Sequence, residues 1–370
     1  MRVVIAPDSF KGTIDAASAA AALAEGWQAA RPGDEVVCLP LADGGEGTVA
    51  VLAAAAEDSV WHEAVVSGPG SARVTARWLE LPGAVHVIEL ASAAGLPQLP
   101  APDPLGAHTA GVGQLLRLAL DAGARRIVLG LGGSASTDGG TGALTALGAR
   151  FLDAGQRELP PGGGALIRLA SADLSGLRPP PPGGLTCLTD VRAPLLGPNG
   201  AAVVFAPQKG ATAQQVIDLE QGLAKLAVVL RGDPAAPGAG AAGGTGYGLA
   251  AAWGAQLRPG SAEIARIAGL DTALTGAGLV ITGEGRYDQT SGDGKVVGAV
   301  IAAAVTAGVP AALVAGLIGG PPGPGLSRAV TLAGLAGDPA AAMADPARWL
   351  RQAGRELAGS ANLADPQPLA

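Results

Sequence analysis

The sequence predicts an α/β protein of two domains, in which a doubly wound parallel sheet is interrupted by a second domain. Its 370 residues are too many for one ordinary core. Apolar strand-like runs alternate with Ala-rich helical stretches near both ends of the chain, the βαβ pattern of parallel sheets. The middle changes character, because residues 61–90 alternate like strands of a sheet with one solvated face. We therefore expect one discontinuous domain of residues 1–65 and 272–370, and an inserted mixed α/β domain of residues 66–271.

Composition narrows the function classes. Hydrophobic residues make up 48% of the chain and aromatic residues only 3%, which suits thin, closely packed layers. A formal charge of −7 without long charge blocks argues against non-specific nucleic-acid or membrane-surface binding, but not against a local anion site. Cys38 and Cys187 have no metal-binding spacing and suit a reducing compartment. The first residues form a strand pattern, not a signal peptide, so we expect a cytoplasmic protein.

Near the N-terminus, two successive strands end in loops that carry charged residues. Residues 2–6 predict a strand, Ala16–Ala30 a helix capped by Thr13 or Asp15, Val36–Leu39 a strand, and Thr48 the start of a second helix. The loops contain Asp8, Lys11, Asp43 and Glu46. In an open parallel sheet the carboxyl ends of the strands line the ligand crevice, so these residues are expected to face one cleft. The alternative is a pair of helix-capping turns.

The middle of the chain predicts the following elements, in order: strands at 62–67, 71–81 and 84–90, a helix at 114–122, strands at 148–153 and 185–188, a strand at 202–205, and helices at 212–230 and 249–257. Asp190 follows one of these strands, where a catalytic or metal-binding carboxylate is often placed. Lys209 stands beside a glycine just after another predicted strand, where a lysine can bind phosphate. The alternative is an ordinary surface lysine. His62 and His86 have no spaced partner and are assigned structural roles.

A glycine-rich segment at residues 130–140 is the strongest candidate for a ligand-binding loop. Its sequence is Gly-Leu-Gly-Gly-Ser-Ala-Ser-Thr-Asp-Gly-Gly. An apolar strand-like run precedes it and an Ala/Leu-rich helical run follows it. Glycines let the backbone approach a ligand, and a helix N-terminus favours an anion such as phosphate. The Asp138 carboxylate fits a metal ion or a substrate hydroxyl better than bare phosphate. The alternative is a tight turn with a helix cap.

Near the C-terminus, residues 279–282 predict a buried strand that ends in Gly-Glu-Gly-Arg, residues 283–286. Lys295 stands at the start of the last long helix, and 310–316 and 329–332 predict closing strands. Residues 296–327 contain no charged residue and could suggest a membrane span. Because Gly308 and Pro310 interrupt this stretch, we expect a helix, a turn and a buried strand instead.

Two enzyme classes compete for these motifs. Gly130, Gly132 and Ala135 match a dinucleotide fingerprint after a strand, with Asp153 about 20 residues further on, which favours a nicotinamide-dependent dehydrogenase. That chemistry leaves Asp138, Lys209, Glu284 and Arg286 without clear roles. Phosphoryl transfer uses all of these residue types, because it needs backbone N–H donors, cations on the phosphates, and carboxylates for Mg²⁺.

Five motifs, in this order, resemble the bacterial type-1 glycerate kinase family: residues 6–12, 40–47, 132–140, 207–210 and 282–286. The resemblance runs from residue 2 to about residue 335. It implies ATP-dependent phosphorylation of D-glycerate with Mg²⁺, usually at the 2-hydroxyl to give 2-phosphoglycerate. It also implies a Rossmann-like domain that is split in sequence, a second α/β domain, and an active site in the cleft between them. A homodimer is compatible with the sequence.

This resemblance assigns expected roles, although sequence order leaves the distances between the residues open. The backbone of Gly132, Gly133, Ser134, Gly139 and Gly140 would hold the nucleotide phosphates. Asp190 would orient or deprotonate the glycerate hydroxyl. Lys11, Lys209 and Arg286 would neutralise the glycerate carboxylate and the moving phosphoryl group, and Asp8 and Ser9 would also contact the substrate. Mg²⁺ would be held from among Asp43, Glu46, Asp138 and Asp288.

The chain departs from the family pattern at Ser67, Thr137 and Ala193. In the family, Asn usually stands at the position of Thr137, and Asn-Pro-Leu usually stands where this chain has Ala193-Pro194-Leu195. The departures at Thr137 and Ala193 leave open a third hypothesis, a non-catalytic sensor of a sugar acid or nucleotide on a kinase scaffold. Which hydroxyl accepts the phosphate also remains open.

Overall fold

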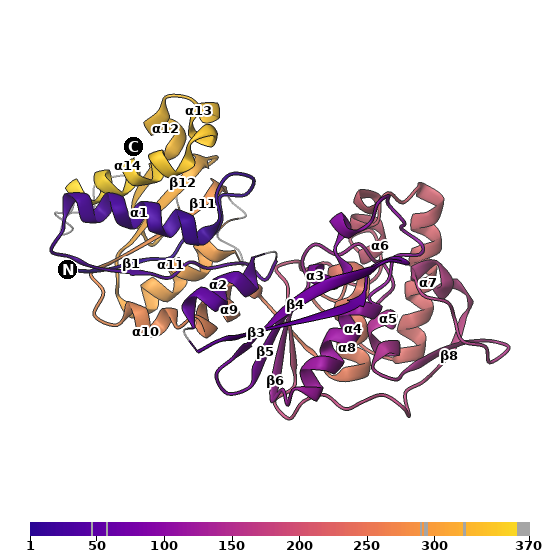
Figure 1. The fold of residues 1–370 in the computed structure, drawn as a ribbon. Helices are drawn as coiled ribbons and strands as arrows, with labels where there is room; N and C mark the ends of the chain where they lie inside the picture. The colour runs from indigo at the N-terminus through magenta and orange to yellow at the C-terminus, as the bar shows by residue number, and fades with distance from the viewer. Residues whose placement is uncertain (46, 57, 289–290, 292–294, 321–322, 361–370) are drawn as a thin grey trace. The chain divides into compact units, whose positions relative to one another are not determined.

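The computed structural model describes residues 1–45, 47–56, 58–288, 291, 295–320 and 323–360. The predicted α/β class is confirmed (Figure 1). The chain forms two compact units, the first from Met1–Asp43, Ala50–Glu57 and Gly260–Ala370, and the second from Gly44–Val49 and Asp58–Pro259. The residue boundaries that we expect for the domains, 1–65, 66–271 and 272–370, stay a prediction.

The first unit contains a five-stranded parallel sheet in the order β13-β12-β11-β1-β2. Its strands come from the two ends of the chain: β1 (Arg2–Ile5), β2 (Glu35–Cys38), β11 (Leu279–Tyr287), β12 (Ala311–Ile318) and β13 (Leu326–Thr331). Chain order changes direction at β1, which pairs with β2 on one side and with β11 on the other. In doubly wound sheets, this is where ligands bind, beyond the carboxyl ends of the strands.

Helices cover both faces of this sheet (Figure 1). They are α1 (Ala16–Ala30), α2 (Thr48–Ala55), α9 (Gly260–Ile267), α10 (Leu270–Leu274), α11 (Val296–Ala307), α12 (Leu332–Ala336), α13 (Pro339–Ala344) and α14 (Pro346–Gly359). Successive strand residues point to opposite faces. Val314 of β12 therefore packs in the core that includes α1 and α14, whereas Leu313 packs with Val297 of α11.

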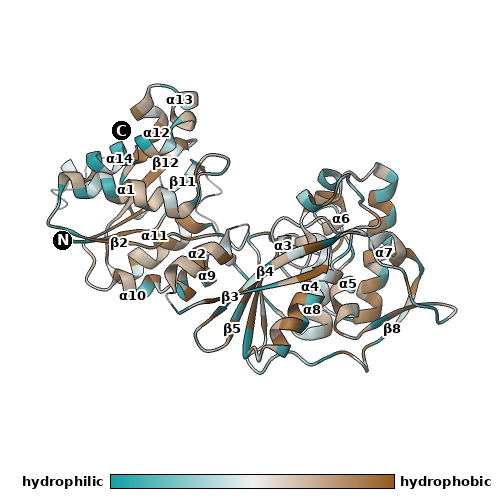
Figure 2. Ribbon diagram, viewed as in Figure 1, coloured by the Kyte–Doolittle hydropathy of each residue, from teal (hydrophilic) through white to brown (hydrophobic). Residues whose placement is uncertain are grey.

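Helices α1 and α14 pack closely against each other in the first unit. Asp15 caps α1 by accepting a hydrogen bond from the Ser18 amide at 2.8 Å, as the sequence predicts. A Cβ atom on Gly354 would lie 2.3 Å from the Leu23 carbonyl oxygen, so only glycine allows this close approach. Figure 2 shows hydrophilic teal residues along α14, whereas β12 is largely brown. Helix α14 thus buries one narrow face and exposes the rest.

The second unit contains a six-stranded mixed sheet in the order β10-β9-β6-β5-β4-β3. Its strands are β3 (Val60–Ser67), β4 (Arg73–Leu81), β5 (Val85–Glu89), β6 (Arg126–Gly130), β9 (Leu185–Leu188) and β10 (Gln256–Arg258). The pairs β3–β4 and β4–β5 are antiparallel, and the remaining pairs are parallel. Strands β7 (Arg150–Asp153) and β8 (Leu169–Asp173) form a separate antiparallel pair.

Helices and 3₁₀ segments surround this mixed sheet. They are α3 (Ala91–Ala94), α4 (Ala110–Asp121), α5 (Thr141–Ala146), α6 (Ala201–Phe205), α7 (Ala213–Leu230), α8 (Ala241–Trp253) and the 3₁₀ segments η1 (Leu96–Gln98), η2 (Gly163–Arg168) and η3 (Pro207–Lys209). Helix α7 begins with a capping box between Thr212 and Gln215. Gly113 of α4 lets the helix touch α5, because a Cβ there would lie 2.2 Å from the Ala143 carbonyl oxygen.

Three predictions of secondary structure are wrong. Residues 202–205 form helix α6, not a strand, because a short apolar run does not distinguish a strand from a buried helical turn. The helix predicted at 249–257 ends at Trp253, and Gln256–Arg258 form strand β10 instead. The helix that begins after Lys295 is not the last long one, since α14 follows it.

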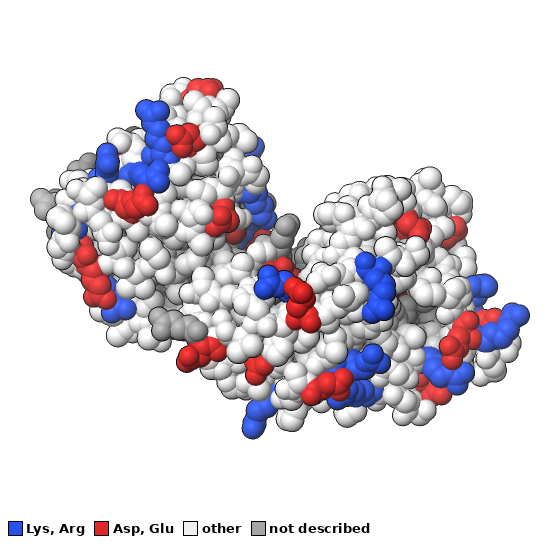
Figure 3. Space-filling view, viewed as in Figure 1, with Lys and Arg blue, Asp and Glu red and all other residues white. Residues whose placement is uncertain are grey.

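The apolar stretch at 296–327 folds as predicted, into helix α11, a turn and strand β12. Of the helices that the structure describes, none combines the length and apolarity that a membrane crossing requires. Figure 3 shows basic and acidic side chains interspersed on the visible face of the molecule. That pattern agrees with the absence of long charge blocks in the sequence.

Candidate functional site

The first unit contains a pocket of about 380 Å³ with a charged lining, which we call the acidic pocket. Its charged residues come from loops or strand ends far apart in sequence: Asp8, Lys11, Asp43, Glu284, Arg286, Asp288 and Lys295. Asp8 and Asp43 follow β1 and β2, and Glu284 lies in the carboxyl half of β11. Because these three strands are parallel neighbours, their carboxyl ends bring the side chains to one edge of the sheet.

Two buried carboxylates in the acidic pocket have raised pKa values. Asp8 is only 8% exposed. Burial raises the pKa of Asp8 to about 6, and the neighbouring Asp43 carboxylate adds to the rise. Burial likewise raises the pKa of Glu284. A carboxylate that titrates near neutral pH and faces a pocket is typical of a functional site.

Cations in the same pocket offset part of this negative charge. The ammonium of Lys11 donates a hydrogen bond to Asp43 Oδ2 at 3.2 Å, and the Asp43 carboxylate raises the pKa of Lys11. Lys11 is 75% exposed, so it stays accessible to a ligand. Arg286 and Lys295 also line the pocket. The pocket therefore offers both cations for an organic acid and carboxylates for a metal ion.

The remaining lining of the acidic pocket is mostly apolar. It comes from Phe10 and from residues around α12, α13 and the start of α14, namely Leu332, Pro339, Ala342, Met343 and Pro346. Apolar walls around a few convergent polar groups are typical of small-molecule sites.

The structure brings together six residues for which the sequence predicts site roles: Asp8, Ser9, Lys11, Asp43, Arg286 and Asp288. Glu46 lies outside the described residues. Glu284 and Lys295 also line the pocket, although no role was predicted for them. The signal for Glu284 was its place at the carboxyl end of a predicted parallel strand. For Lys295 the chain offers only a glycine–lysine pair before a helix.

The second unit contains a pocket of about 660 Å³, which we call the glycine-loop pocket. Gly132, Gly133 and Ser134 of the loop between β6 and α5 line it. Its other polar lining residues are Glu89, Ser92, Gln98, Gln208 and Lys209. Three predicted nucleotide-binding residues and one predicted cation thus share one pocket. Gly139 and Gly140 lie further along the same loop and do not line it.

Lys209 is the buried cation of the glycine-loop pocket, with only 3% of its surface exposed. Its ammonium donates a hydrogen bond to the Ser136 carbonyl oxygen at 2.5 Å, which attaches η3 to the glycine loop. Burial lowers the pKa of Lys209 to about 8, and the Asp138 carboxylate opposes that shift. An anion in the pocket would add a second favourable charge and stabilise the protonated form.

Asp138 is fully buried and lines neither pocket. Its carboxylate accepts hydrogen bonds from the Thr109 amide and hydroxyl and from the Gly140 and Gly142 amides. Both oxygens therefore have donors from the protein. This geometry gives no support to metal ligation by Asp138 and indicates a role in holding the glycine loop.

Asp190 lies two residues beyond β9, is half-buried and lines neither of these two pockets. Its catalytic role stays a prediction.

Asp153 does not lie where a dinucleotide-binding site would need its acidic residue. It belongs to β7, which pairs with β8 in the separate antiparallel pair instead of lying beside β6. Its carboxylate accepts hydrogen bonds from the Gly155 amide and from the Arg157 amide and guanidinium, so it stabilises its own turn. The fingerprint needs an acidic residue at the end of the neighbouring parallel strand. The geometry therefore favours the phosphoryl-transfer reading.

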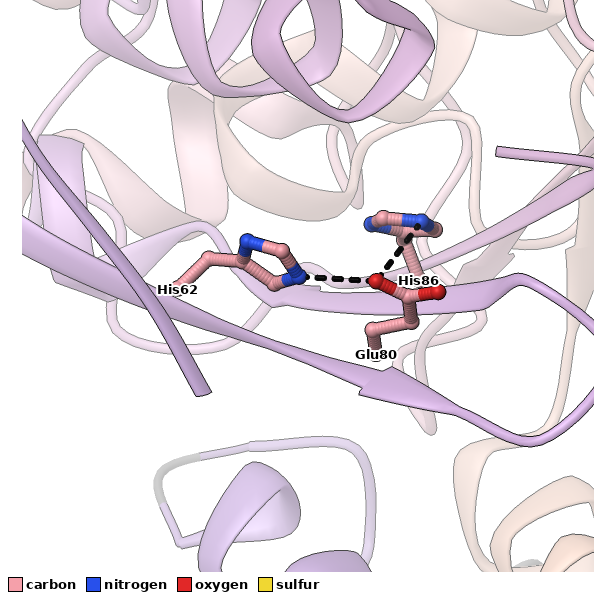
Figure 4. Close-up of side chains that lie close together, drawn as sticks. All are labelled: His62, Glu80 and His86. Atoms are coloured by element: carbon pink, nitrogen blue, oxygen red, sulfur yellow. Dashed lines mark hydrogen bonds and ion pairs between the residues drawn. The ribbon is translucent and has the colours of Figure 1, made fainter. Parts of the chain in front are cut away.

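Strand pairing also gathers His62, Glu80 and His86, a cluster that the sequence spacing did not indicate (Figure 4). Glu80 Oε2 lies 2.8 Å from His62 Nε2 and 3.8 Å from His86 Nε2. However, His86 Nδ1 accepts a hydrogen bond from the Trp78 indole N–H at 3.1 Å, so a neutral His86 ring carries its proton on Nε2. If a metal ion bound His86 Nε2, the proton of the neutral ring would move to Nδ1 and would face the Trp78 indole N–H. We therefore assign the cluster a structural role.

Comparison with protein families matches residues 3–362 to the Glycerate kinase family. The chain is 41% identical over 305 residues to a glycerate 2-kinase of Escherichia coli (strain K12), covering 80% of each chain. It is 43% identical over 304 residues to a glycerate kinase of Bacillus subtilis (strain 168), covering 80% of this chain and 79% of the relative.

The fold is also similar to a solved structure. A crystal structure described as that of glycerate kinase 2 from Salmonella typhimurium LT2 superposes with a TM-score of 0.86 at 38% identity, over 97% of this chain and 98% of the other. Family match, sequence identity and fold agree across nearly the whole chain. The chain is therefore an enzyme that belongs to the glycerate kinase family.

Proposed function

We propose that this enzyme transfers the γ-phosphoryl group of ATP to the 2-hydroxyl of D-glycerate, with Mg²⁺, to form 2-phosphoglycerate. Family membership supports glycerate as the acceptor. The name of the relative from E. coli, glycerate 2-kinase, supports the 2-hydroxyl. The observation that carries the proposal is the acidic pocket, which combines cations for a carboxylate with carboxylates for a hydroxyl and a metal ion.

In this proposal, glycerate binds in the acidic pocket. The Arg286 guanidinium and the Lys11 ammonium pair with its carboxylate, since a guanidinium matches a carboxylate with two parallel hydrogen bonds. Asp8 and Ser9 contact its hydroxyl groups. A substrate hydroxyl can donate a hydrogen bond to the Asp8 carboxylate, which otherwise accepts one from the Ser9 amide.

We assign Mg²⁺ to Asp43 and Asp288, with Glu46 outside the described residues. The residues present fit a hard cation, because carboxylate oxygens are its preferred ligands and several carboxylates line the pocket together. When bound, Mg²⁺ neutralises charge on the transferred phosphoryl group.

We assign the nucleotide phosphates to the glycine-loop pocket. Backbone amides of Gly132 and Gly133, the Ser134 hydroxyl and the Lys209 ammonium are the proposed donors. A lysine acts on phosphate as a point charge, and a glycine loop lets the backbone approach the oxygens. Gly139 and Gly140 support this pocket from within the loop.

In the reaction, a glycerate oxygen forms a bond to the γ-phosphorus while the bond from that phosphorus to the bridging oxygen of ADP breaks. The hydroxyl proton passes to a carboxylate, and we propose Asp190 as this base. Asp190→Asn is expected to lower kcat by roughly 10²–10⁴, the usual effect of losing a positioned base. Steady-state kinetics on a variant with wild-type melting behaviour check it. A kcat within a few-fold of wild type would remove Asp190 from this role.

The proposal is tested by incubating the protein with ATP, Mg²⁺ and D-glycerate and resolving the product by phosphorus NMR. We expect ADP and 2-phosphoglycerate. Turnover to 3-phosphoglycerate would overturn the regiochemistry alone. ATP binding without turnover would favour the sensor hypothesis or another hydroxy acid. A cytoplasmic setting is also proposed, and the free thiols of Cys38 and Cys187 support it.

A further inference from the structure

A buried hydrogen-bond network stands behind the glycine loop. Asp138 Oδ2 accepts from the Thr109 amide at 2.9 Å, from the Thr109 hydroxyl at 2.8 Å and from the Gly142 amide at 3.2 Å. Asp138 Oδ1 accepts from the Gly140 amide at 3.1 Å. Thr109 and Asp138 are both 0% exposed. A buried carboxylate is stable only when donors of this kind surround it.

Thr109 stands at the N-cap of α4, where threonine hydroxyls usually accept from the first amides of their own helix. Here the side chain makes no such capping bond. Its hydroxyl donates to Asp138 instead and accepts from the Ala143 amide in α5 at 3.0 Å. One hydroxyl thus joins the carboxylate of the loop to the first turn of the helix that follows the loop.

Contacts lead from this network to the glycine-loop pocket. The Gly139 amide donates to the Gly243 carbonyl oxygen at 3.0 Å, and Gly243 lines the pocket. Lys209, which also lines the pocket, donates to the Ser136 carbonyl oxygen and is attracted by the Asp138 charge. Any rotation of Asp138 would therefore change both the loop and the position of the cation.

The network has no room to rearrange. A Cβ atom on Gly142 would lie 2.9 Å from both Asp138 Oδ2 and the Thr109 nitrogen, so only glycine fits there. Gly140 has φ +76°, a conformation that favours glycine, and its amide points to the same carboxylate. The Thr109 hydroxyl is the one side-chain donor to Asp138 in the described residues, and it comes from outside the loop.

We propose that Thr109 is a positioning residue for nucleotide binding, because its hydroxyl holds Asp138 and, through it, the glycine loop and Lys209. Thr109 itself does not touch the ligand, since it lines neither pocket. The identity of the ligand, ATP, rests on the function proposed above. The role of Thr109 in fixing the loop rests on the hydrogen bonds alone.

The test compares Thr109→Val, which removes the hydroxyl but keeps the shape, with Thr109→Ser, which keeps the hydroxyl. Thr186→Val is the matched control, because Thr186 is another buried threonine of the same unit, and its hydroxyl accepts from Arg126 at 3.2 Å. Calorimetric titration measures the dissociation constants of ATP and D-glycerate. Amide hydrogen exchange measures protection at residues 138–146.

For Thr109→Val we expect a roughly tenfold weaker affinity for ATP, an unchanged affinity for glycerate and lost protection at 138–146. Thr109→Ser should stay within about threefold of wild type, and Thr186→Val should change neither readout. Wild-type affinity and wild-type protection in a folded Thr109→Val would overturn the proposal. An equal loss of ATP affinity and of protection in Thr186→Val would show that the effect of Thr109→Val is only general destabilisation.

If Thr109→Val does not fold, Thr109→Ala replaces it, since the smaller side chain also removes the hydroxyl donor and cannot overfill the site. The same shift in protection and affinity is expected. If the wild type binds no ATP, the proposed function fails. Exchange at 138–146 still decides the role of Thr109, because that readout needs no ligand.

Discussion

Asp8 and Asp138 are both buried aspartates, but their surroundings are opposite. Asp138 is encircled by four N–H and O–H donors and lines neither pocket. Asp8 faces a pocket together with Asp43 and Glu284, and burial raises its pKa to about 6. The protein supplies four donors to the Asp138 carboxylate, whereas the Asp8 carboxylate accepts a hydrogen bond from the Ser9 amide and faces a pocket that a ligand can enter. Burial alone thus does not distinguish a structural carboxylate from a functional one. The hydrogen-bond donors around each carboxylate distinguish the two.

This difference predicts that Asp8→Asn lowers activity strongly without harming the fold. Losing a carboxylate that contacts the substrate hydroxyl is expected to reduce kcat/KM for glycerate by roughly 10²–10⁴. Steady-state kinetics with ATP in excess measure the effect. Asp15→Asn is the control in the same unit, because asparagine also caps helices, and it should remain within about twofold of wild type. Near-normal activity of Asp8→Asn would show that the Asp8 carboxylate has no functional role in substrate binding.

The reverse result is expected at Asp138. Asp138→Asn places an amide NH₂ against backbone donors, so unfolding free energy should fall by roughly 2–4 kcal/mol. Denaturant unfolding measures it. Asp121→Asn is the control, since Asp121 is 54% exposed in a surface ion pair with Arg178, and it should cost less than about 1 kcal/mol. An Asp138→Asn protein as stable as wild type would show that the carboxylate is not structural.

A smaller effect follows from the pH dependence of stability. The pKa of Asp8 is higher in the fold, about 6, than its ordinary value of 3.8. Stability from protonating Asp8 is therefore present below pH 3.8 and is lost as pH rises through about 6. Asp8→Asn should exceed wild type by roughly 1–3 kcal/mol at pH 8, and this advantage should disappear toward pH 4. Unfolding curves at several pH values check it, and a difference independent of pH would contradict the shift.

Much of the fold follows from local sequence patterns. Helix α1 has the predicted bounds, Ala16–Ala30, because an Asp cap precedes a regular apolar stripe. The predictions fail where the pattern is short or weak. Five residues in α6 fit either a strand or a helical turn. Helix α14 was missed although its buried residues follow the regular spacing of an amphipathic helix, because the sequence interpretation ended near residue 335.

The acidic pocket could be predicted because parallel strands place their loop residues at one edge, so order along the chain implied proximity in space. The role of Asp138 could not be predicted in this way. Its partner Thr109 comes from a different segment, and Thr109 has the signature of an ordinary helix cap. The histidine cluster escaped for a related reason, since antiparallel pairing brings His62 and His86 to Glu80 without regular spacing in sequence.

Calorimetric titration of Lys11→Met and Lys209→Met tests whether glycerate binds in the acidic pocket and the nucleotide binds in the glycine-loop pocket. Lys11→Met should weaken D-glycerate binding at least tenfold and leave ATP binding within about twofold. Lys209→Met should do the opposite, because its ammonium lines the glycine-loop pocket. If Lys11→Met weakens ATP and spares glycerate, or Lys209→Met weakens glycerate and spares ATP, the assignment of the two pockets is wrong.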